Sequence, residues 1–246
     1  MNVIVIGAGV IGLSTAYFLT QRGASVTVID SASCVGEGAS FANGGMITPS
    51  MSEPWNAPGV LLDVVKSLGN DAAPFLLRPK AIPSLLLWGP KFLMESSKER
   101  FEANAIRNFK MANFSNHVLS ELSRDLQLEF QQDDVGTAKI FRNIKSFENA
   151  VINSELLAKE GLNFNVLSTD EVLKLEPALK GSGDSIVGAI QYPGDQSGNA
   201  QKFCESITTI LLKKGVRFVF NQSVIDFMHS NNVVTGVQTN KNTYQA

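Results

Sequence analysis

The sequence is poor in the residues that build metal centres and disulfide frameworks. Its 246 residues include two cysteines, Cys34 and Cys204, and two histidines. The cysteines form no C-x-x-C motif, so neither a metal site nor a disulfide framework is predicted, and a reduced compartment is expected. The first apolar strand is expected to begin at Val3, which leaves no room for a signal peptide, so we expect a cytoplasmic protein.

The chain also lacks an excess of charge of either sign. Its 21 basic and 23 acidic residues leave a formal net charge of −2. The nearest approach to a basic cluster, between Lys98 and Lys110, alternates with acidic residues, as a solvated helix face does. This distribution excludes nucleic acid as a partner, because binding to a phosphate backbone needs a concentrated basic surface.

No apolar run is long enough to cross a membrane. The most apolar stretch outside the N-terminal unit, residues 81–94, is interrupted by Pro83 and Pro90, whereas a transmembrane helix needs about 20 apolar residues. We expect this stretch to be a core segment, because apolar runs of its length are commonly buried. The alternative is that its leucines, Trp88 and Phe92 form a surface that dips into the lipid interface on the inner face of the cell membrane.

The most informative motif opens the chain, in residues 3–30. An apolar strand leads into Gly7, Ala8, Gly9, Val10, Ile11 and Gly12, and a helix and a second strand follow. Gly7 permits a tight turn, Gly9 lets backbone N–H groups approach a pyrophosphate, and Gly12 lets the helix pack close to the sheet. Because a helix N-terminus at this point favours an anion, the pattern predicts a dinucleotide-binding βαβ unit.

The acid that ends this motif bears on which nucleotide is bound. Asp30 comes 18 residues after Gly12, at the end of the second strand, where its carboxylate can accept hydrogen bonds from ribose hydroxyls. A carboxylate at this position would repel a 2′-phosphate, which argues against NADP. The motif alone is compatible with either NAD or FAD.

The remaining pattern predicts an α/β fold in which the nucleotide-binding domain is split in sequence. With 44% hydrophobic residues, the chain has enough apolar content for one large or two small cores. We expect helices at 98–126, 147–159 and 199–214, strands at 137–142, 164–167, 188–193, 216–220 and 233–239, a capping box at Ser168 and Glu171, and His229 in a turn. The regular βαβ rhythm returns only at the end, so residues 1–50 and 195–246 are expected to form a Rossmann-like domain around an inserted α+β domain, residues 51–194.

Residues 36–59, GEGASFANGGMITPSMSEPWNAPG, begin a long loop. Seven of the nine prolines lie between Pro49 and Pro90, which predicts an irregular segment at 50–90, and such long loops are usually functional. Ser40 and Asn43, with the glycines that follow, suit a loop that crosses a pyrophosphate and reaches a flavin, because each offers a hydrogen bond or lets the backbone approach. Serine and asparagine are also common turn formers.

This loop and the opening motif together resemble one family. They are similar to the FAD-dependent D-amino-acid dehydrogenases of the small-subunit type, within the D-amino-acid oxidase and glycine oxidase superfamily. The most specific match is the signature formed by Pro54, Trp55, Asn56, Ala57, Pro58 and Gly59. Similarity continues through residues 176–179, 188–198 and 215–221, so it spans nearly all of the chain.

The resemblance implies FAD as the cofactor, bound by the split domain, with the insert as the substrate domain. It places the glycine motif on the pyrophosphate, Asp30 on the adenosine ribose, Ser40 on a phosphate oxygen, residues 43–46 beside the flavin and Val224 beside the adenine. The full set of implied cofactor contacts is Gly7, Ala8, Gly9, Val10, Ile11, Gly12, Asp30, Ser31, Ser40, Ala42, Asn43, Gly44, Gly45, Met46 and Val224.

The resemblance also implies a reaction. A hydride passes from the Cα of a D-amino acid to FAD, the resulting imine is hydrolysed to a 2-oxo acid and ammonia, and the electrons pass on to an acceptor in the membrane. The protein orients the Cα–H bond, binds the carboxylate with a cation and favours the neutral amine. In the family, that cation comes from a C-terminal part with most of the substrate cleft, which lies beyond the position matching Ala246. We therefore expect a fragment or a truncated product, and no catalytic residue is assigned.

Three other functions are compatible with these residues. They are a flavin amine oxidase of the glycine or sarcosine type, an NAD-linked dehydrogenase, and a non-catalytic remnant. The signature at residues 54–59 favours a D-amino acid as the substrate, and the loop at residues 40–45 argues against NAD. The sequence indicates neither the electron acceptor nor an oligomeric state.

Overall fold

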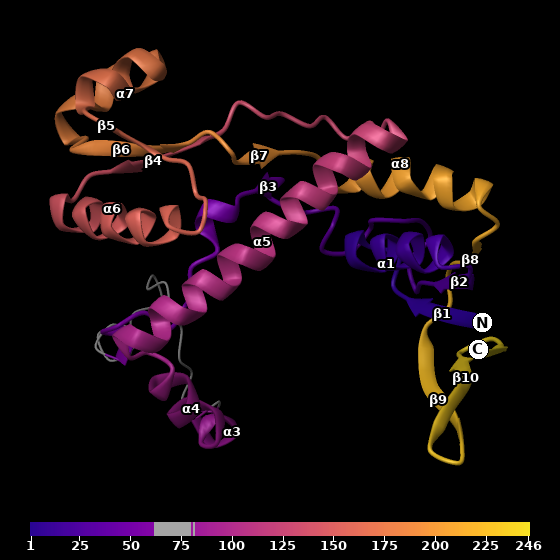
Figure 1. The fold of residues 1–246 in the computed structure, drawn as a ribbon. Helices are drawn as coiled ribbons and strands as arrows, with labels where there is room; N and C mark the ends of the chain where they lie inside the picture. The colour runs from indigo at the N-terminus through magenta and orange to yellow at the C-terminus, as the bar shows by residue number, and fades with distance from the viewer. Residues whose placement is uncertain (62–79, 81) are drawn as a thin grey trace. The chain divides into compact units, whose positions relative to one another are not determined.

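A computed structural model describes residues 1–61, 80 and 82–246 of the chain (Figure 1). This part divides into two compact units that alternate along the sequence. Unit 1 consists of Met1–Ile47, Leu119–Asp134 and Gln196–Ala246, and unit 2 of Thr48–Val118 and Val135–Asp195. Each unit contains its own cluster of buried apolar side chains.

Unit 1 is built on a parallel sheet. Its strands are β1 (Asn2–Ile6), β2 (Ser25–Ile29) and β8 (Arg217–Val219), in the order β1-β2-β8. Parallel neighbours need a crossover connection, and α1 (Val10–Gln21) provides it between β1 and β2, while α8 (Ala200–Lys213) leads into β8. The two helices pack against each other, and their buried side chains, which include Leu13 and Ile207, fill the core of the unit.

Two smaller antiparallel sheets complete unit 1. One pairs β3 (Met46–Ile47) with β7 (Gln196–Ser197), and the other is a meander of β9 (Val224–Ser230), β10 (Val233–Thr239) and β11 (Thr243–Gln245). The expectation of a turn at His229 is wrong, because His229 lies in β9 opposite Val234. Asn231 and Asn232 form the turn instead, with φ of 49° and 62°, and two-residue hairpin turns favour such left-handed residues.

Unit 2 combines helices with an antiparallel sheet, whose strands β4 (Thr137–Phe141), β6 (Gly188–Tyr192) and β5 (Asn165–Leu167) run in the order β4-β6-β5. Its helical elements are the 3-10 segments η1 (Pro49–Met51) and η3 (Pro177–Ser185), the helices α3 (Ile82–Leu85), α4 (Trp88–Met94), α6 (Ile144–Ala158) and α7 (Thr169–Leu175), and the first part of α5 (Lys98–Leu126). The predicted capping box of α7 is confirmed, since Ser168 and Glu171 exchange both hydrogen bonds. Phe109 of α5 and Ile190 of β6 are the most deeply buried side chains of the core.

A buried carboxylate joins three segments of unit 2 that are distant in sequence. Asp195, which is 1% exposed, follows β6. Its Oδ2 accepts hydrogen bonds from the hydroxyls of Ser50 and Thr137, both at 2.6 Å, and its Oδ1 accepts one from the backbone N–H of Ser50 at 3.3 Å. A carboxylate removed from water needs such donors, so the contact ties η1 and the start of β4 to the turn after β6.

The domain boundaries predicted from the sequence place one long segment in a different unit from the one in which the structure places it. Leu119–Asp134, expected within the inserted domain, belongs to unit 1. The reason is packing, because Leu119, Leu122, Leu128 and Phe130 join the apolar cluster around α1 and α8. The assignment of unit 1 to cofactor binding and of unit 2 to the substrate stays a prediction.

The apolar stretch at residues 81–94 does not form the expected core segment. Among its described residues, Leu86, Leu87, Trp88, Leu93 and Met94 are all exposed. The predicted loop at residues 50–90 lies in large part outside the described residues, since it includes 62–79 and 81, and its described parts contain η1, α3 and the start of α4. Within the described part of the chain, no helix has the length and apolar character needed to span a bilayer.

Candidate cofactor site

The glycine motif connects β1 to α1, and two of its glycines are required by the geometry. Gly7 has a φ of +102°, in the left-handed region that residues with a side chain avoid. Gly12 lies so close to Gly7 that a Cβ at Gly12 would come within 1.9 Å of the Gly7 carbonyl oxygen. The first turn of α1 is therefore packed directly against the end of β1, as the motif predicts.

Asp30 lies at the end of β2, and both of its carboxylate oxygens bind the neighbouring loops. Oδ2 accepts a hydrogen bond from the backbone N–H of Ala8 at 2.6 Å, and Oδ1 accepts one from Ala32 at 2.8 Å. The side chain thus links the glycine loop to the segment after β2. A carboxylate has about four acceptor positions, so these two bonds leave capacity for the hydroxyls of a ribose.

Ser40 lies at the N-terminus of α1. Its Oγ accepts a hydrogen bond from the backbone N–H of Val10 at 3.1 Å, and a Cβ on Gly9, the N-cap residue, would lie 3.1 Å from the same oxygen. Ser40 also forms a hydrogen bond with the thiol of Cys204 in α8. Burial raises the pKa of this thiol, and the hydrogen bond with Ser40 lowers it in part. The serine hydroxyl is therefore held where the helix N-terminus attracts an anion.

The loop that precedes β3 is held by the side chain of Asn43 and by contact with Gly198, the residue after β7. Asn43 accepts a hydrogen bond from the backbone N–H of Gly45 through Oδ1 at 2.7 Å. Gly45 has a φ of +68°, and a Cβ there would lie 2.5 Å from the carbonyl oxygen of Gly198. Gly198 in turn contacts the ring of Phe130 so closely that its own Cβ would come within 2.6 Å. Gly45 is therefore needed for the loop to approach the residue after β7, and Gly198 is needed for that residue to pack against Phe130.

These segments surround one cavity of unit 1 with a volume of about 1070 Å³, slightly above the usual range for ligand pockets. The candidate residues that line it are Gly7, Gly9, Val10, Ile11, Gly12, Asp30, Ser31, Ser40, Asn43, Gly45 and Met46. The lining residues that sequence reasoning missed include four from distant segments, Leu119, Phe130, Gly198 and Phe203. These four come from segments far along the chain, and no local motif marks them.

Four candidate residues lie outside the lining of this cavity. Gly44 lines a smaller neighbouring cavity of about 320 Å³, beside Asn199 at the start of α8. Ala8 is fully buried and contributes its backbone N–H to Asp30, while Ala42 is exposed. Val224 packs in a separate apolar cluster around Ile29. The contacts of Ala42 with the cofactor and of Val224 with the adenine stay predictions.

The charges around the large cavity come from carboxylates and backbone dipoles. Among the described residues that line it there is no lysine or arginine, whereas Asp30 and Glu37 are present. Hydrogen bonds from the backbone and hydroxyl of Ser33 hold the pKa of Glu37 below its ordinary value. An anion in this cavity would be stabilised by N–H groups and the dipole of α1, and the carboxylates suit sugar hydroxyls.

Several similar proteins are named D-amino acid dehydrogenase. The D-amino acid dehydrogenase of Vibrio atlanticus (strain LGP32) is 34% identical over 246 residues, which is 100% of this chain and 59% of that protein. The D-amino acid dehydrogenase of Paramagnetospirillum magneticum is 36% identical over 247 residues, covering 100% of this chain and 58% of that protein. The predicted resemblance is confirmed, and the chain spans less than two thirds of the length of these relatives.

The fold of this chain is also found in solved structures. The glycine oxidase from Bacillus cereus superposes with a TM-score of 0.69 at 22% identity, over 99% of this chain and 52% of that one. At this identity the likeness shows the fold alone, and it confirms the predicted α/β class with a split Rossmann-like domain and an α+β insert. Residues 2–246 match the family described as FAD dependent oxidoreductase, which confirms FAD as the predicted cofactor. Because this match extends over nearly the whole chain, the protein belongs to the FAD-dependent oxidoreductase family.

Proposed function

We propose that this chain binds FAD and serves the oxidation of D-amino acids to 2-oxo acids and ammonia, with the electrons passed to an acceptor in the membrane. The observation that carries the proposal is the convergence of the glycine motif, Ser40 and Asp30 on one large cavity. The 34–36% identity to D-amino acid dehydrogenases supports the substrate class.

The residues around the cavity fit FAD. A Cβ at Gly12 would collide with the Gly7 carbonyl oxygen, so glycine at position 12 lets the first turn of α1 lie against the loop, where its N–H groups can meet a pyrophosphate. Ser40 would donate its hydroxyl hydrogen to a phosphate oxygen, since its oxygen already accepts from Val10. Asp30 would accept from the ribose hydroxyls while it continues to hold Ala8. The loop at residues 43–46 would lie beside the flavin.

When bound, the flavin supplies the two-electron acceptor for the reaction. The chain's own residues bind and orient it: the glycine loop fixes the phosphates, and Asp30 fixes the sugar. Phe130 and Phe203, both buried and in edge-to-face contact at 5.7 Å, close one wall of the cavity with apolar surface and exclude water there. We assign no substrate-binding cation among the described residues.

Spectroscopy and turnover test this proposal. Purified protein should show the visible absorption bands of bound flavin, and these bands should bleach when a D-amino acid is added in the absence of oxygen. An artificial electron acceptor should then be reduced with D-amino acids and not with their L-enantiomers. A colourless but active enzyme that requires NAD would refute the proposal, and bleaching by glycine or sarcosine alone would reassign the substrate.

Binding and turnover should be measured separately, because the chain covers 59% of its relative. The first measurement is the shift in thermal unfolding on addition of FAD, which we expect to be positive for this chain. Absence of any shift would favour a non-catalytic remnant. A positive shift without turnover would retain the FAD site and leave the substrate-binding residues to be supplied by another part of the enzyme.

We further propose that the enzyme is cytoplasmic and contacts the inner face of the cell membrane. The reason is the acceptor, since electrons can leave a bound flavin only for a carrier that comes close to it. Fractionation of cells that express the protein would test this location: it should pellet with membranes at low salt and be released by mild detergent. Recovery in the cytosolic fraction under all conditions would contradict it.

A further inference from the structure

The loop before β3 contains a pair of residues that can react with each other in water. Asn43 is followed by Gly44, and this is the single Asn-Gly pair in the sequence. The backbone nitrogen of the residue after an asparagine can attack the side-chain amide, and a glycine at that position has no Cβ to hinder the attack. Both residues are exposed and lie outside helices and strands, so water and hydroxide reach them.

The hydrogen bonds of the loop keep the two reacting groups together. Oδ1 of Asn43 accepts a hydrogen bond from the backbone N–H of Gly45 at 2.7 Å, and this bond closes a ring that contains the Gly44 peptide. The side-chain amide is thereby kept beside the Gly44 nitrogen. The same N–H would stabilise the negative charge that forms on Oδ1 when a nucleophile adds to the amide carbon. Among the hydrogen bonds between described residues, none uses the Gly44 N–H.

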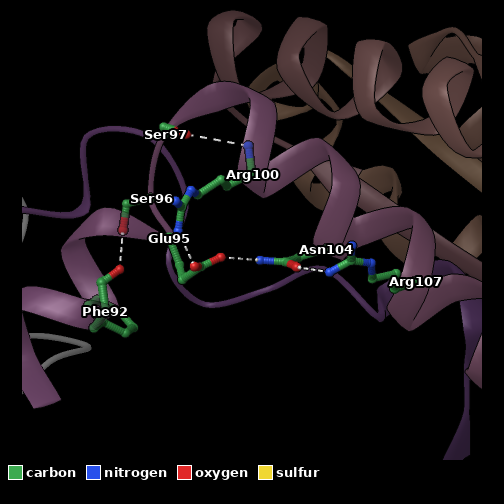
Figure 2. A network of polar contacts seen from close by, with 7 residues as sticks. All are labelled: Phe92, Glu95, Ser96, Ser97, Arg100, Asn104 and Arg107. Atoms are coloured by element: carbon green, nitrogen blue, oxygen red, sulfur yellow. Dashed lines mark hydrogen bonds and ion pairs between the residues drawn. The ribbon is translucent and has the colours of Figure 1, made fainter.

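Asn104 in α5 has the opposite arrangement (Figure 2). Its Nδ2 donates a hydrogen bond to the Glu95 carboxylate at 3.1 Å, and its Oδ1 accepts one from Arg107 at 3.5 Å. The next residue, Ala105, is buried within the helix, where its N–H is bonded to the helical backbone. Asn104 is therefore an internal reference that should not react.

We propose that Asn43 is a site of spontaneous deamidation, and that the reaction makes protein molecules without the cofactor unable to bind it tightly. The Gly44 nitrogen loses its proton to hydroxide and bonds to the Asn43 side-chain carbon, the bond from that carbon to Nδ2 breaks, and ammonia leaves with a proton from water. Water then opens the cyclic imide at the side-chain carbonyl, which gives aspartate, or at the backbone carbonyl, which gives isoaspartate. Overall, water is consumed, ammonia is released, and no group is oxidised or reduced.

Either product disfavours an anion in the large cavity, which Asn43 lines. Asp30 and Glu37 are already there, and the described lining residues include no lysine or arginine, so a further carboxylate would repel a pyrophosphate. Isoaspartate also lengthens the backbone by a carbon atom. That atom would disturb the contact with Gly198, whose N–H donates to the Gly45 carbonyl at 2.8 Å. This consequence for FAD rests on the proposed function, whereas the deamidation itself does not.

Mass spectrometry tests the deamidation directly. The purified chain, freed of FAD, is incubated at mildly alkaline pH and digested, and its peptides are examined for replacement of an amide by a carboxyl group and for isoaspartate. Residue 43 should convert, and faster as the pH rises, because the attacking nitrogen must lose a proton. Asn104 in the same sample should stay intact. In protein whose thermal shift shows that FAD is bound, the conversion should slow, because a flavin beside residues 43–46 would cover the loop.

Substitutions separate the reaction from its consequence. Gly44→Ala should lose most of the conversion. Its Cβ would meet no atom within 4 Å and the φ of Gly44 lies outside the left-handed region, so the loop should keep its path. Asn43→Asp reproduces the charged product and should bind FAD about tenfold more weakly than Asn43→Gln, which keeps a neutral amide. Quenching of flavin fluorescence measures both affinities.

Four results would overturn the proposal. They are an intact residue 43 in the FAD-free protein, equal conversion of Asn43 and Asn104, unchanged conversion in Gly44→Ala, and equal FAD affinity of Asn43→Asp and Asn43→Gln. The mass measurement requires neither FAD nor substrate. Its failure is therefore distinguishable from failure of the proposed function, which the thermal shift of the parent protein with FAD reports.

Discussion

The tight contact between Gly12 and Gly7 makes the substitution Gly12→Ala a sharp test of the cofactor site. An alanine Cβ at this position would lie 1.9 Å from the Gly7 carbonyl oxygen and 3.4 Å from a methyl carbon of Val5. Non-bonded contacts of this kind stay above 3.0 Å, so the start of α1 must move by about 1 Å relative to the loop. Overpacking of this size costs about 1–3 kcal/mol.

The displacement acts where the pyrophosphate is expected, because the same turn holds the Val10 N–H on Ser40. If the cost falls on the geometry that binds FAD, the affinity should fall by roughly 5- to 150-fold. Quenching of flavin fluorescence during titration measures this affinity, and circular dichroism measured in parallel shows whether the fold survives.

Gly181→Ala is the matched control. Gly181 lies in η3 of unit 2 and does not line the cavity, a Cβ there would meet no atom within 4 Å, and its φ is not in the left-handed region. This variant should bind FAD as the parent protein does. The reasoning would be refuted if Gly12→Ala bound FAD with unchanged affinity, or if both variants lost binding equally.

Three further substitutions test other contacts. Ser40→Ala removes the acceptor of the Val10 N–H and should weaken FAD binding by about fivefold, the equivalent of one helix cap at about 1 kcal/mol; unchanged affinity in a fluorescence titration would contradict this role. Asp195→Ala leaves the buried hydroxyl of Ser50 and the partly buried hydroxyl of Thr137 without their acceptor and should lower the free energy of unfolding by about 2–4 kcal/mol in urea titrations, with a smaller loss for Asp195→Asn. Hydrogen bonds from Asn104 and then Arg100 hold the pKa of Glu95 below 4.5, so its contribution is present above pH 4.5 and is lost as the pH falls further. The difference in thermal midpoint between the parent and Glu95→Gln should therefore be present at neutral pH and disappear in acid, and a difference that persists there would refute the assignment.

The local parts of the candidate site could be predicted because short-range constraints dictate them. Gly7 needs a left-handed φ and Gly12 needs space, and both follow from a strand, a turn and a helix within twelve residues. Asp30 ends the neighbouring strand, and parallel pairing of β1 with β2 brings it back to the glycine loop. The sequence separation of these residues is small, so one supersecondary unit contains the whole contact.

The far wall of the cavity could not be predicted in the same way. Phe130 and Gly198 lie 68 residues apart, and they contact each other because the segment after α5 packs in unit 1. The helical spacing of apolar residues predicted that α5 is a helix with one apolar face. This spacing does not show which apolar core that face packs against. For the same reason, residues 119–134 were placed in the inserted domain.

The amino-acid sequence by itself determined that the cofactor is a dinucleotide, because the glycine loop for a pyrophosphate and the acid for a ribose lie at a recognisable spacing within one βαβ unit. Tertiary structure decided what surrounds that unit. It brought Phe130 and Gly198 to the cavity, and it left Leu86, Leu87 and Trp88 exposed where hydropathy predicted a core. The physical reason is that burial depends on whether another element covers an apolar face, and neither composition nor periodicity states which element that is.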